Sequence, residues 1–437
     1  RTSISLTHSA KIIHFTGRFR HIMDNINIIS AGQRFHMVTS ELIERPQYTD
    51  WLQRWKDRDV IKVITGLRRC GKSMVLELFR RSLVAKGIAE SRIISINFES
   101  LDAHYPTDYQ SLYDYIVERL QPNCTNYVFL DEVQHVEHFE KAADGLYVRD
   151  DVDLYITGSN ANLLSSELAT LLTGRYVELK MLPLSFSEYR NALQSTANDN
   201  ALFDRYLTYG GLPYVTQLTE DRDIADYLGG VFNTILVADI AQRNPRMDMR
   251  AFNDVAAFLA DNVGNLASLK SMSGGLAASG RRISPTTISG YIEEMVRNYL
   301  LFEATRYDLQ GKAYLHSESK YYLGDMGFRF WLLGKRQGDL GHRIENVIYL
   351  ELLRRYSTVS VGKLRGGEID FVASDANGPH YYQVSQTVLD ESTLARELAP
   401  LQTVRDNHPK TLLTLDTVGL GDYQGIQHRN ILDWLLE

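Results

Sequence analysis

The chain has 437 residues, of which 44% are hydrophobic and 23% are charged, and its formal net charge is -7. These proportions are ordinary for a globular protein of several domains, and the acidic balance gives no support for bulk affinity for nucleic acids. With 2 cysteines, Cys70 and Cys124, the composition excludes a disulfide framework or a cysteine-based metal cluster, and it favours a reducing, cytoplasmic location. No uninterrupted apolar run approaches the roughly 20 residues of a membrane span.

Residues 1–36 form a basic segment with no acidic residue before Asp24 and with little hydrophobic periodicity. An arginine-rich, acid-poor segment of this kind is one signature of a transit peptide. We favour a simpler interpretation, in which the segment is a disordered leader or lies upstream of the natural start. The first domain is therefore placed from Met37 onward.

Apolar, β-rich runs alternate with segments of helical periodicity in the next part of the chain. The runs cover residues 60–65, 92–98, 126–131 and 154–158. The helical segments cover residues 73–86, 109–120 and 139–150. This alternation predicts an α/β fold with a doubly wound parallel sheet, in which the carboxyl ends of all strands meet at one ligand-binding edge.

The sequence Gly-Leu-Arg-Arg-Cys-Gly-Lys-Ser at residues 66–73 follows the first predicted strand and precedes the first predicted helix. Its pattern is that of a phosphate-binding P-loop, and the flanking strand and helix disfavour a chance match. Lys72 is expected to neutralise the β- and γ-phosphates of ATP, and the Ser73 hydroxyl is expected to hold Mg²⁺. The predicted nucleotide-binding residues are Gly66, Leu67, Arg68, Arg69, Cys70, Gly71, Lys72, Ser73 and Met74.

Two acidic residues come at the end of the third predicted strand. The carboxylate of Asp131 is expected to face the P-loop and to orient Mg²⁺ together with Ser73. Glu132, one residue further on, is expected to polarise the attacking water. Solvated acids are common at strand ends, but their combination with a P-loop about sixty residues earlier predicts a P-loop NTPase that hydrolyses ATP.

Three further polar residues are candidates for catalytic roles. Ser159 and Asn160 follow the fourth predicted strand, where either side chain is expected to hold the attacking water or to cap the next helix. Arg175 follows Thr173-Gly174, and its guanidinium is either an arginine finger for a γ-phosphate, in its own or a neighbouring chain, or one half of a surface ion pair.

Five stretches of the chain together resemble AAA-superfamily ATPases of bacteria and archaea that carry a DUF4143 domain. They read GLRRCGKS, FLDEVQHV, ITGSNANLL, LTGRYVELKMLPLSFSEY and YLTYGGLP. The resemblance implies an ATPase core at residues 37–195, a helical lid at 196–248, a winged-helix-like region at 249–315 and a nuclease-like α/β domain at 316–437. A polar break, QSTANDN, lies near the first of these boundaries.

The nuclease-like domain of that resemblance implies a metal held by two strand acids, with a lysine two residues after the second acid. Asp370 fits the first strand acid, and Glu345 fits an acid on the preceding helix. Gln383 stands where the second acid is expected, and Ser385 stands where the lysine is expected. Because a neutral amide and a hydroxyl replace a carboxylate and a cation, we expect a degenerate site that does not cleave by this mechanism.

The winged-helix-like region is a candidate for binding double-stranded DNA. Ser284 and Pro285 are expected to cap and begin its recognition helix, and residues 300–314 are expected to form a two-stranded wing. The nearby cations Arg281, Arg282 and Arg297 are offset by Glu293 and Glu294, which disfavour contact with phosphate. A winged helix that binds a protein, or that is purely structural, is the alternative.

Together these features predict Mg²⁺-dependent ATP hydrolysis that drives conformational change in a nucleic-acid-associated C-terminal half. The alternative is a nucleotide-gated module that turns ATP over slowly and binds a protein target. The cofactors in both cases are ATP and Mg²⁺, and no membrane role is expected.

Overall fold

The structure is a computed structural model that describes residues 42–100, 105–159, 172–311, 313–336 and 338–437. Residues Ile43–Glu437 form one compact unit. The predicted N-terminal leader lies outside the described residues.

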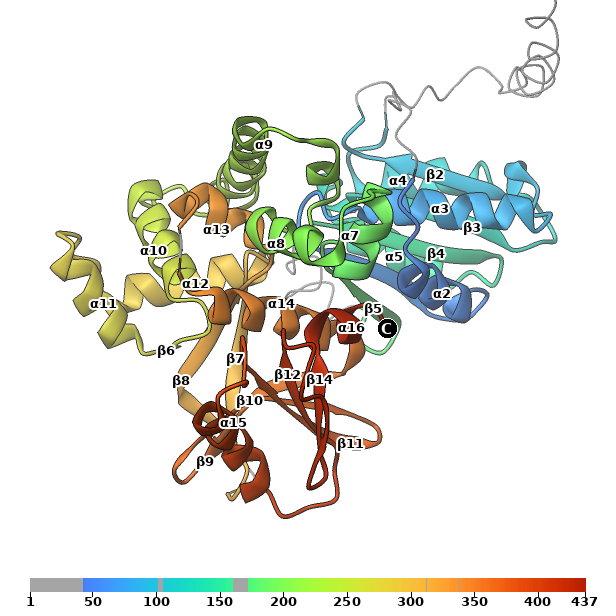
Figure 1. Ribbon diagram of the computed structural model, residues 1–437. Coiled ribbons are helices and arrows are strands. Elements are labelled where there is room, and N and C mark those ends of the chain that lie inside the picture. The colour runs from blue at the N-terminus through green and yellow to red at the C-terminus, as the bar shows by residue number, and fades with distance from the viewer. Residues whose placement is uncertain (1–41, 101–104, 160–171, 312, 337) are drawn as a thin grey trace, which may run out of the picture. The chain divides into compact units, whose positions relative to one another are not determined.

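The first part of this unit is built on a parallel sheet with the strand order β2-β3-β4-β1-β5 (Figure 1). Its strands are β1 (Ile61–Gly66), β2 (Ile93–Asn97), β3 (Asn126–Asp131), β4 (Val152–Gly158) and β5 (Tyr176–Met181). Every neighbouring pair is parallel. The sheet confirms the predicted P-loop NTPase architecture, and its order places β4 between β1 and β3.

Helices cover both faces of this sheet, which explains its continuous apolar strands. The helices are α2 (Pro46–Trp55), α3 (Lys72–Ala85), α4 (Tyr109–Val117) and α5 (Phe139–Tyr147). Along β3, Tyr127 and Phe129 share a core with α2 and α3, whereas Val128 and Leu130 share a second core with α4 and α5. The two cores follow from the two-residue side-chain period of a strand.

A helical segment follows the sheet and packs into the same core as α2 and α3. It contains α7 (Phe186–Leu193), α8 (Asp199–Tyr209), η4 (Pro213–Gln217), α9 (Asp221–Thr234), the π-helical η5 (Ile235–Ala241) and α10 (Met249–Asp261). Asp221–Ala241 is long and apolar enough to cross a membrane by length and composition alone. Its residues Ile224, Leu228 and Phe232 are buried in the protein core, so packing accounts for much of this apolar character.

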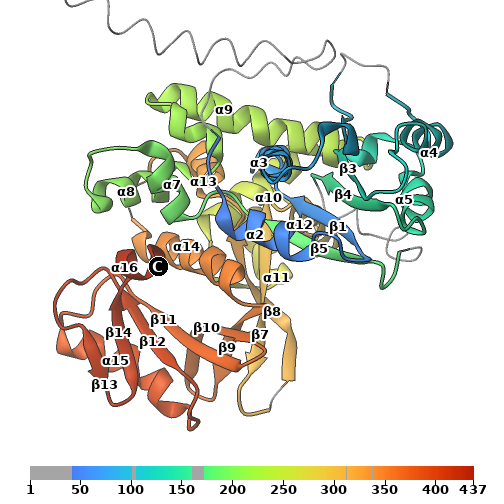
Figure 2. The same cartoon turned by 90° about the vertical axis from the view of Figure 1, so that its right-hand side faces the viewer.

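The last part is built on a mixed sheet with the order β13-β14-β12-β11-β10-β9-β7-β8-β6. Its strands are β6 (Leu266–Ala267), β7 (Leu301–Asp308), β8 (Ala313–Leu323), β9 (Thr358–Leu364), β10 (Gly367–Asp375), β11 (Gly378–Val384), β12 (Lys410–Thr414), β13 (Gly421–Tyr423) and β14 (Ile426–Asn430). Helices α14 (Leu340–Arg355) and α16 (Ile431–Leu435) pack with one face, and α15 (Glu391–Thr403) packs with the other (Figure 2).

The predicted winged-helix-like region does not end where its boundary was placed. Helices α11 (Leu269–Ala278) and α12 (Pro285–Arg297) precede the β7–β8 hairpin, and β7 pairs in parallel with β9 of the C-terminal sheet. The predicted boundary between residues 315 and 316 therefore falls inside strand β8, because the expected wing is an integral part of the larger sheet.

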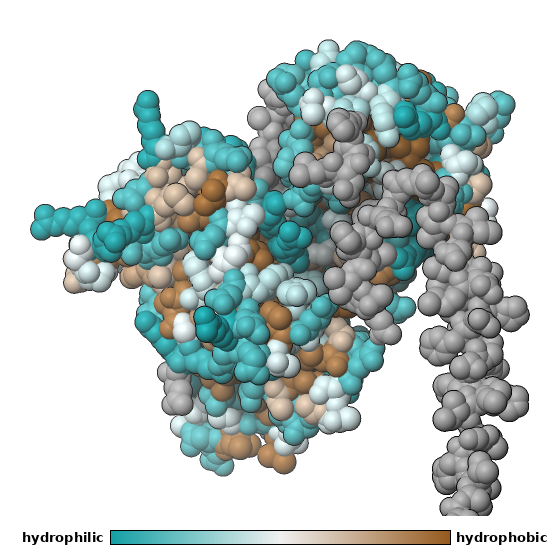
Figure 3. Space-filling model, turned by 90° about the horizontal axis from the view of Figure 1, so that it is seen from above, coloured by the Kyte–Doolittle hydropathy of each residue, from teal (hydrophilic) through white to brown (hydrophobic). Residues whose placement is uncertain are grey.

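On the face seen from above, hydrophobic residues lie scattered among hydrophilic ones (Figure 3).

The Tyr-Gly-Gly-Leu-Pro turn after α8 joins the helical segment to α13 (Met326–Leu333) through one buried carboxylate. Asp325 caps α13 by accepting a hydrogen bond from Gly327 N at 2.8 Å, and it accepts another from Gly211 N at 2.7 Å. Gly210 has φ +78°, and a Cβ there would lie 1.8 Å from Asp325 Oδ1. Gly210 therefore allows the turn to approach the carboxylate closely.

We predict that Asp325→Ala lowers the free energy of unfolding by about 3 kcal/mol, because it removes a helix cap and leaves buried N–H groups without acceptors. Asp390→Ala, which removes the exposed cap of α15, is the matched control and is expected to cost much less than Asp325→Ala. Urea unfolding followed by circular dichroism measures both. Equal losses in the two variants would contradict the joining role of Asp325.

Candidate functional site

The P-loop lies at the carboxyl edge of the parallel sheet, between β1 and α3. Gly66, Arg69 and Gly71 have φ values of 147°, 65° and 105°, so the loop turns repeatedly through left-handed conformations. A Cβ on Gly66 would lie 2.1 Å from Met181 O, so a side chain cannot fit there. These conformations allow successive N–H groups to face an anion at the N-terminus of α3.

The ammonium of Lys72 is buried among polar atoms of the loop and of the β4 end. Its Nζ donates to Gly66 O at 3.1 Å, to Leu67 O at 3.3 Å and to Ser159 Oγ at 3.1 Å. It also lies 3.6 Å from Glu132 Oε1. The strand order explains this meeting, because β4 carries Ser159 into the space between the P-loop and the end of β3.

The carboxylate of Asp131 is held beside the P-loop serine. It accepts hydrogen bonds from the Thr157 hydroxyl, from Asn97 Nδ2 at 3.0 Å and from the Ser73 side chain. Burial raises the pKa of Asp131 despite these donors. A hydroxyl and a carboxylate side by side are the oxygen donors that Mg²⁺ prefers, so the residues present fit this ion.

Glu132 adopts a left-handed backbone conformation with φ 55°, which is costly for a residue with a Cβ and is typical of functional sites. Its carboxylate accepts hydrogen bonds from Ser159 Oγ and Gln134 Nε2, each at 2.5 Å. Burial alone would raise the pKa of Glu132, but Lys72 and these donors bring it below its ordinary value. Glu132 is therefore ionised and oriented toward the P-loop.

The remaining predicted site residues differ in their positions. Arg68 contacts Glu99 at 2.5 Å and Asp239 at 3.5 Å, and Met74 is exposed at the start of α3. Leu67 and Cys70 are buried, so only their backbones are available to a ligand. Asn160 lies outside the described residues, and its predicted role stays a prediction.

Arg175 lies at the opposite edge of the sheet from the P-loop. It immediately precedes β5, whose Tyr176 is in register with Ile61 at the start of β1. Its guanidinium pairs with Asp144 and lies 5.4 Å from the Tyr147 ring centroid. The length of β1 separates it from the loop by roughly 17 Å, so this arrangement gives no support to a finger role within its own chain.

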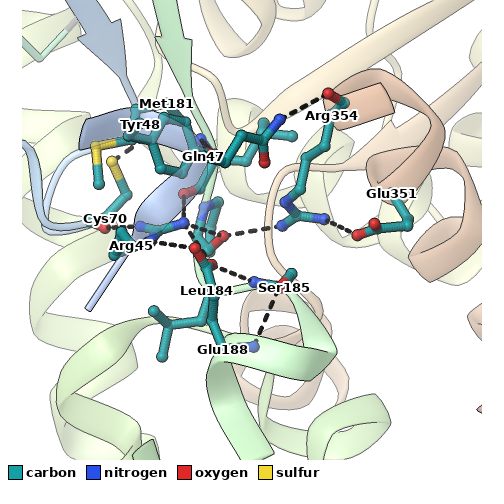
Figure 4. A network of polar contacts seen from close by, with 12 residues as sticks. Arg45, Gln47, Tyr48, Cys70, Met181, Leu184, Ser185, Glu188, Glu351 and Arg354 are labelled. Atoms are coloured by element: carbon teal, nitrogen blue, oxygen red, sulfur yellow. Dashed lines mark hydrogen bonds and ion pairs between the residues drawn. The ribbon is translucent and has the colours of Figure 1, made fainter. Parts of the chain in front are cut away.

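An arginine that the sequence analysis did not select connects the P-loop to the helical segment (Figure 4). Arg45, before α2, donates to Cys70 O at 3.0 Å, to Leu182 O at 3.1 Å and to Pro183 O at 3.2 Å. The same guanidinium pairs with Glu188 at 2.8 Å, and its side chain is only 3% exposed. It lies outside every P-loop motif, so no local signal marked it.

The Arg45 network continues to α14 of the C-terminal part. Arg354 donates to Pro183 O at 2.9 Å, and its own carbonyl accepts from Gln47 Nε2 at 2.7 Å (Figure 4). Arg354 also pairs with Glu351 at 3.1 Å within α14. One carbonyl, that of Pro183, therefore accepts from arginines of the P-loop side and of the C-terminal side.

Two further contacts reach the P-loop from distant segments. The hydroxyl of Tyr299, after α12, donates to Thr65 Oγ1 at 2.8 Å, and Thr65 donates to Glu178 of β5 at 2.6 Å. Asp239, in the π-helical segment, faces Arg68, and its Oδ2 is buried without a hydrogen-bond partner among the described residues. Burial raises the pKa of Asp239.

The C-terminal sheet brings together three of the residues that its family resemblance indicated. Glu345 of α14, Asp370 of β10 and Gln383 of β11 are all buried, and Gln383 Oε1 accepts from Asp370 N at 3.4 Å. Ser385 donates to Thr387 O at 3.2 Å and is not part of the group.

The cation of this cluster comes from β8 and was missed by sequence reasoning. Lys320 Nζ lies 2.8 Å from Glu368 Oε1, 3.1 Å from Glu345 Oε1 and 4.0 Å from Asp370 Oδ1. Burial and then Glu345 raise the pKa of Asp370 to about 8, although Lys320 opposes that rise. In the described part of the chain, no group of three or more His, Cys, Asp or Glu side chains is arranged to hold a metal ion.

The expected recognition helix of the winged-helix-like region has little free positive charge. Ser284 caps α12 as predicted, accepting from Thr287 N at 3.1 Å. Arg281 pairs with Asp254 at 3.0 Å, and Arg297 pairs with Glu294 at 3.0 Å. DNA binding by this helix stays a prediction.

Comparison with known proteins agrees with the fold and the P-loop geometry. Residues 58–190 match the family described as "AAA domain", which makes this part of the chain a P-loop ATPase domain of the AAA class. An uncharacterized protein of Haemophilus influenzae is 38% identical over 404 residues, which cover 92% of this chain and 100% of that protein. The chain therefore belongs to the same family as the Haemophilus influenzae protein. An uncharacterized protein of Methanocaldococcus jannaschii is 26% identical over 387 residues, covering 82% of this chain and 83% of that protein.

The remaining comparisons concern the second half and the solved structures. Residues 200–339 match a family described as "Domain of unknown function (DUF8612)", so the predicted DUF4143 name is not confirmed. The Walker-type ATPase of Pyrococcus abyssi is 14% identical, with a TM-score of 0.48 over 69% of this chain and 99% of that chain. The Aeropyrum pernix ORC2 protein in its ADP form is 10% identical, with a TM-score of 0.36 over 76% of this chain and 98% of that chain.

We predict that Lys320→Met lowers the free energy of unfolding by about 3 to 5 kcal/mol, because the buried carboxylate of Glu345 and the partly exposed one of Glu368 lose their cation. The deficit should shrink as the pH falls toward 4, since protonation removes the uncompensated charges. Lys363→Met, on strand β9 of the same sheet, is the control and should change stability by less than about 1 kcal/mol. Guanidinium unfolding at two pH values measures both effects, and a deficit that grows on acidification would contradict the assignment.

Proposed function

We propose that this protein is a cytoplasmic, Mg²⁺-dependent ATPase whose nucleotide state repositions its C-terminal half. One observation carries the proposal: Lys72, Ser159 and Glu132 meet in one buried hydrogen-bonded group beside Ser73 and Asp131. ATP hydrolysis requires a loop that binds phosphate, oxygen donors that hold a hard cation and an ionised acid that polarises the attacking water.

The residues of this group have distinct proposed roles. Lys72 exchanges its contacts with the carbonyls of Gly66 and Leu67 for contacts with the β- and γ-phosphates. Ser73 and Asp131 would hold Mg²⁺, which supplies neutralisation of phosphate charge when it is bound. Glu132 orients the attacking water and accepts its proton, and Ser159 fixes the direction of the Glu132 carboxylate.

The contacts around the loop support a link between nucleotide state and the rest of the chain. Arg45 binds the loop carbonyl of Cys70, Tyr299 binds the residue before Gly66, and Asp239 faces Arg68. A movement of the loop on phosphate binding changes the geometry of all three contacts. We propose double-stranded DNA as the partner of the C-terminal half, with a protein target as the alternative.

Steady-state ATP turnover by the purified protein tests the enzymatic part of the proposal. Lys72→Ala should abolish turnover and weaken ATP binding, because the phosphate charge then lacks its ammonium. Glu132→Gln should lower turnover by roughly 100-fold or more while ATP remains bound, because water loses its base. Turnover that persists in Lys72→Ala would show that the activity belongs to a contaminant or to another site.

Addition of double-stranded DNA to the same assay separates the two partners. Turnover that rises with DNA, and that vanishes in Lys72→Ala, supports a DNA-directed ATPase. Turnover indifferent to DNA leaves the ATPase proposal standing and favours the protein-binding alternative.

A further inference from the structure

A cavity of about 440 Å³ lies between α8, α13 and α14, among residues that none of the nucleotide-site contacts involve. Its volume is in the range of small-molecule sites. Its ionisable lining residues other than tyrosine are Asp204, Arg205, Arg329, Lys335, Arg336 and Arg343. The wall thus presents five cationic side chains and one carboxylate, in a chain whose net charge is -7.

Arg343 is a lining cation whose charge is only weakly compensated. Its guanidinium donates to Thr208 Oγ1 at 3.1 Å, and no carboxylate lies within 4.0 Å of it among the residues that the structure describes. Burial and the neighbouring Arg329 lower the pKa of Arg343, although the Asp204 carboxylate opposes that fall. A half-buried guanidinium beside a second one has the environment of an anion-binding group.

Arg329 forms the deeper part of the same cationic wall. Its side chain is 7% exposed, and its Nε donates to Ala260 O at 3.2 Å. Its acidic partner, Asp339, lies 3.5 Å away and is itself more than half exposed. The contact with Asp339 is therefore long and solvent-screened, so the charge of Arg329 remains available to the cavity.

Two more cations of the wall lie toward solvent, and the fifth, Arg205, donates to the carbonyls of Val215 and Leu218. Lys335 pairs with Asp221 at 2.6 Å, and Arg336 pairs with Asp261 at 2.7 Å, with about half of each side chain exposed. Exposed ion pairs contribute little to stability and rearrange readily. Both side chains can therefore exchange their carboxylate partners for a ligand that carries several negative charges.

We propose that this cavity binds a small, multiply charged phosphate compound, with its phosphate groups between Arg329 and Arg343. One guanidinium group can donate two parallel hydrogen bonds to two oxygens of a phosphate, which an ammonium group cannot do. Because α14 carries Arg343 near its start and Arg354 in its last turn, such a ligand acts on the helix that contacts Pro183. The site is separate from the P-loop, and its existence does not rest on the proposed ATPase activity.

Isothermal titration calorimetry, in which pyrophosphate is added to the full chain and its affinity is measured, tests this site. Lys72→Ala serves as the background, so that the P-loop contributes little to the signal. We expect saturable binding that Arg343→Gln weakens roughly tenfold or more and that the double variant Lys335→Gln/Arg336→Gln weakens similarly. Arg222→Gln/Arg396→Gln, which removes two exposed charges outside the cavity, is the matched control and should leave the affinity unchanged.

Three outcomes would overturn the proposal. In the first, neither cavity variant changes the affinity for pyrophosphate. In the second, the control variant loses as much affinity as the cavity variants. In the third, citrate binds as tightly as pyrophosphate. The third outcome would show a general anion site that does not distinguish phosphates from carboxylates. If Arg343→Gln does not fold, as judged by circular dichroism, the Lys335→Gln/Arg336→Gln variant decides the test, because those side chains are exposed.

Discussion

The arrangement of the P-loop depends on one buried guanidinium, that of Arg45. It donates hydrogen bonds to the carbonyls of Cys70, Leu182 and Pro183 and to the Glu188 carboxylate. A buried guanidinium is stable only when its donors are satisfied, so these four groups hold one another in place. The P-loop, the end of β5 and helix α7 are therefore fixed by a single residue that precedes α2.

The sequence predicted the parts of the molecule whose signals are contiguous. The P-loop, the acids after β3 and the alternation of strands and helices each occupy a short segment, and their side chains meet because parallel strands end at one edge. Arg45 and Tyr299 were missed because their partners lie 25 and 234 residues away in the chain. Sequence spacing carries no information about such contacts.

The charged cluster of the C-terminal sheet was likewise not predictable from sequence spacing. Lys320 completes the acidic cluster from β8, a strand that the predicted boundary between residues 315 and 316 divides, so the cluster holds a cation although Ser385 supplies none. The hairpin read as a wing is continuous with this sheet through β9. Both differences have one cause, which is the pairing of strands that are distant in sequence.

Amide hydrogen exchange of α14, measured by mass spectrometry with and without ATP in the Glu132→Gln protein, tests the central claim most directly. If the P-loop is coupled to the C-terminal half, ATP changes the exchange of residues 340–355, and Arg45→Lys removes that change although ATP still binds. Exchange that changes only around the P-loop, with α14 identical in both states, would contradict the coupling.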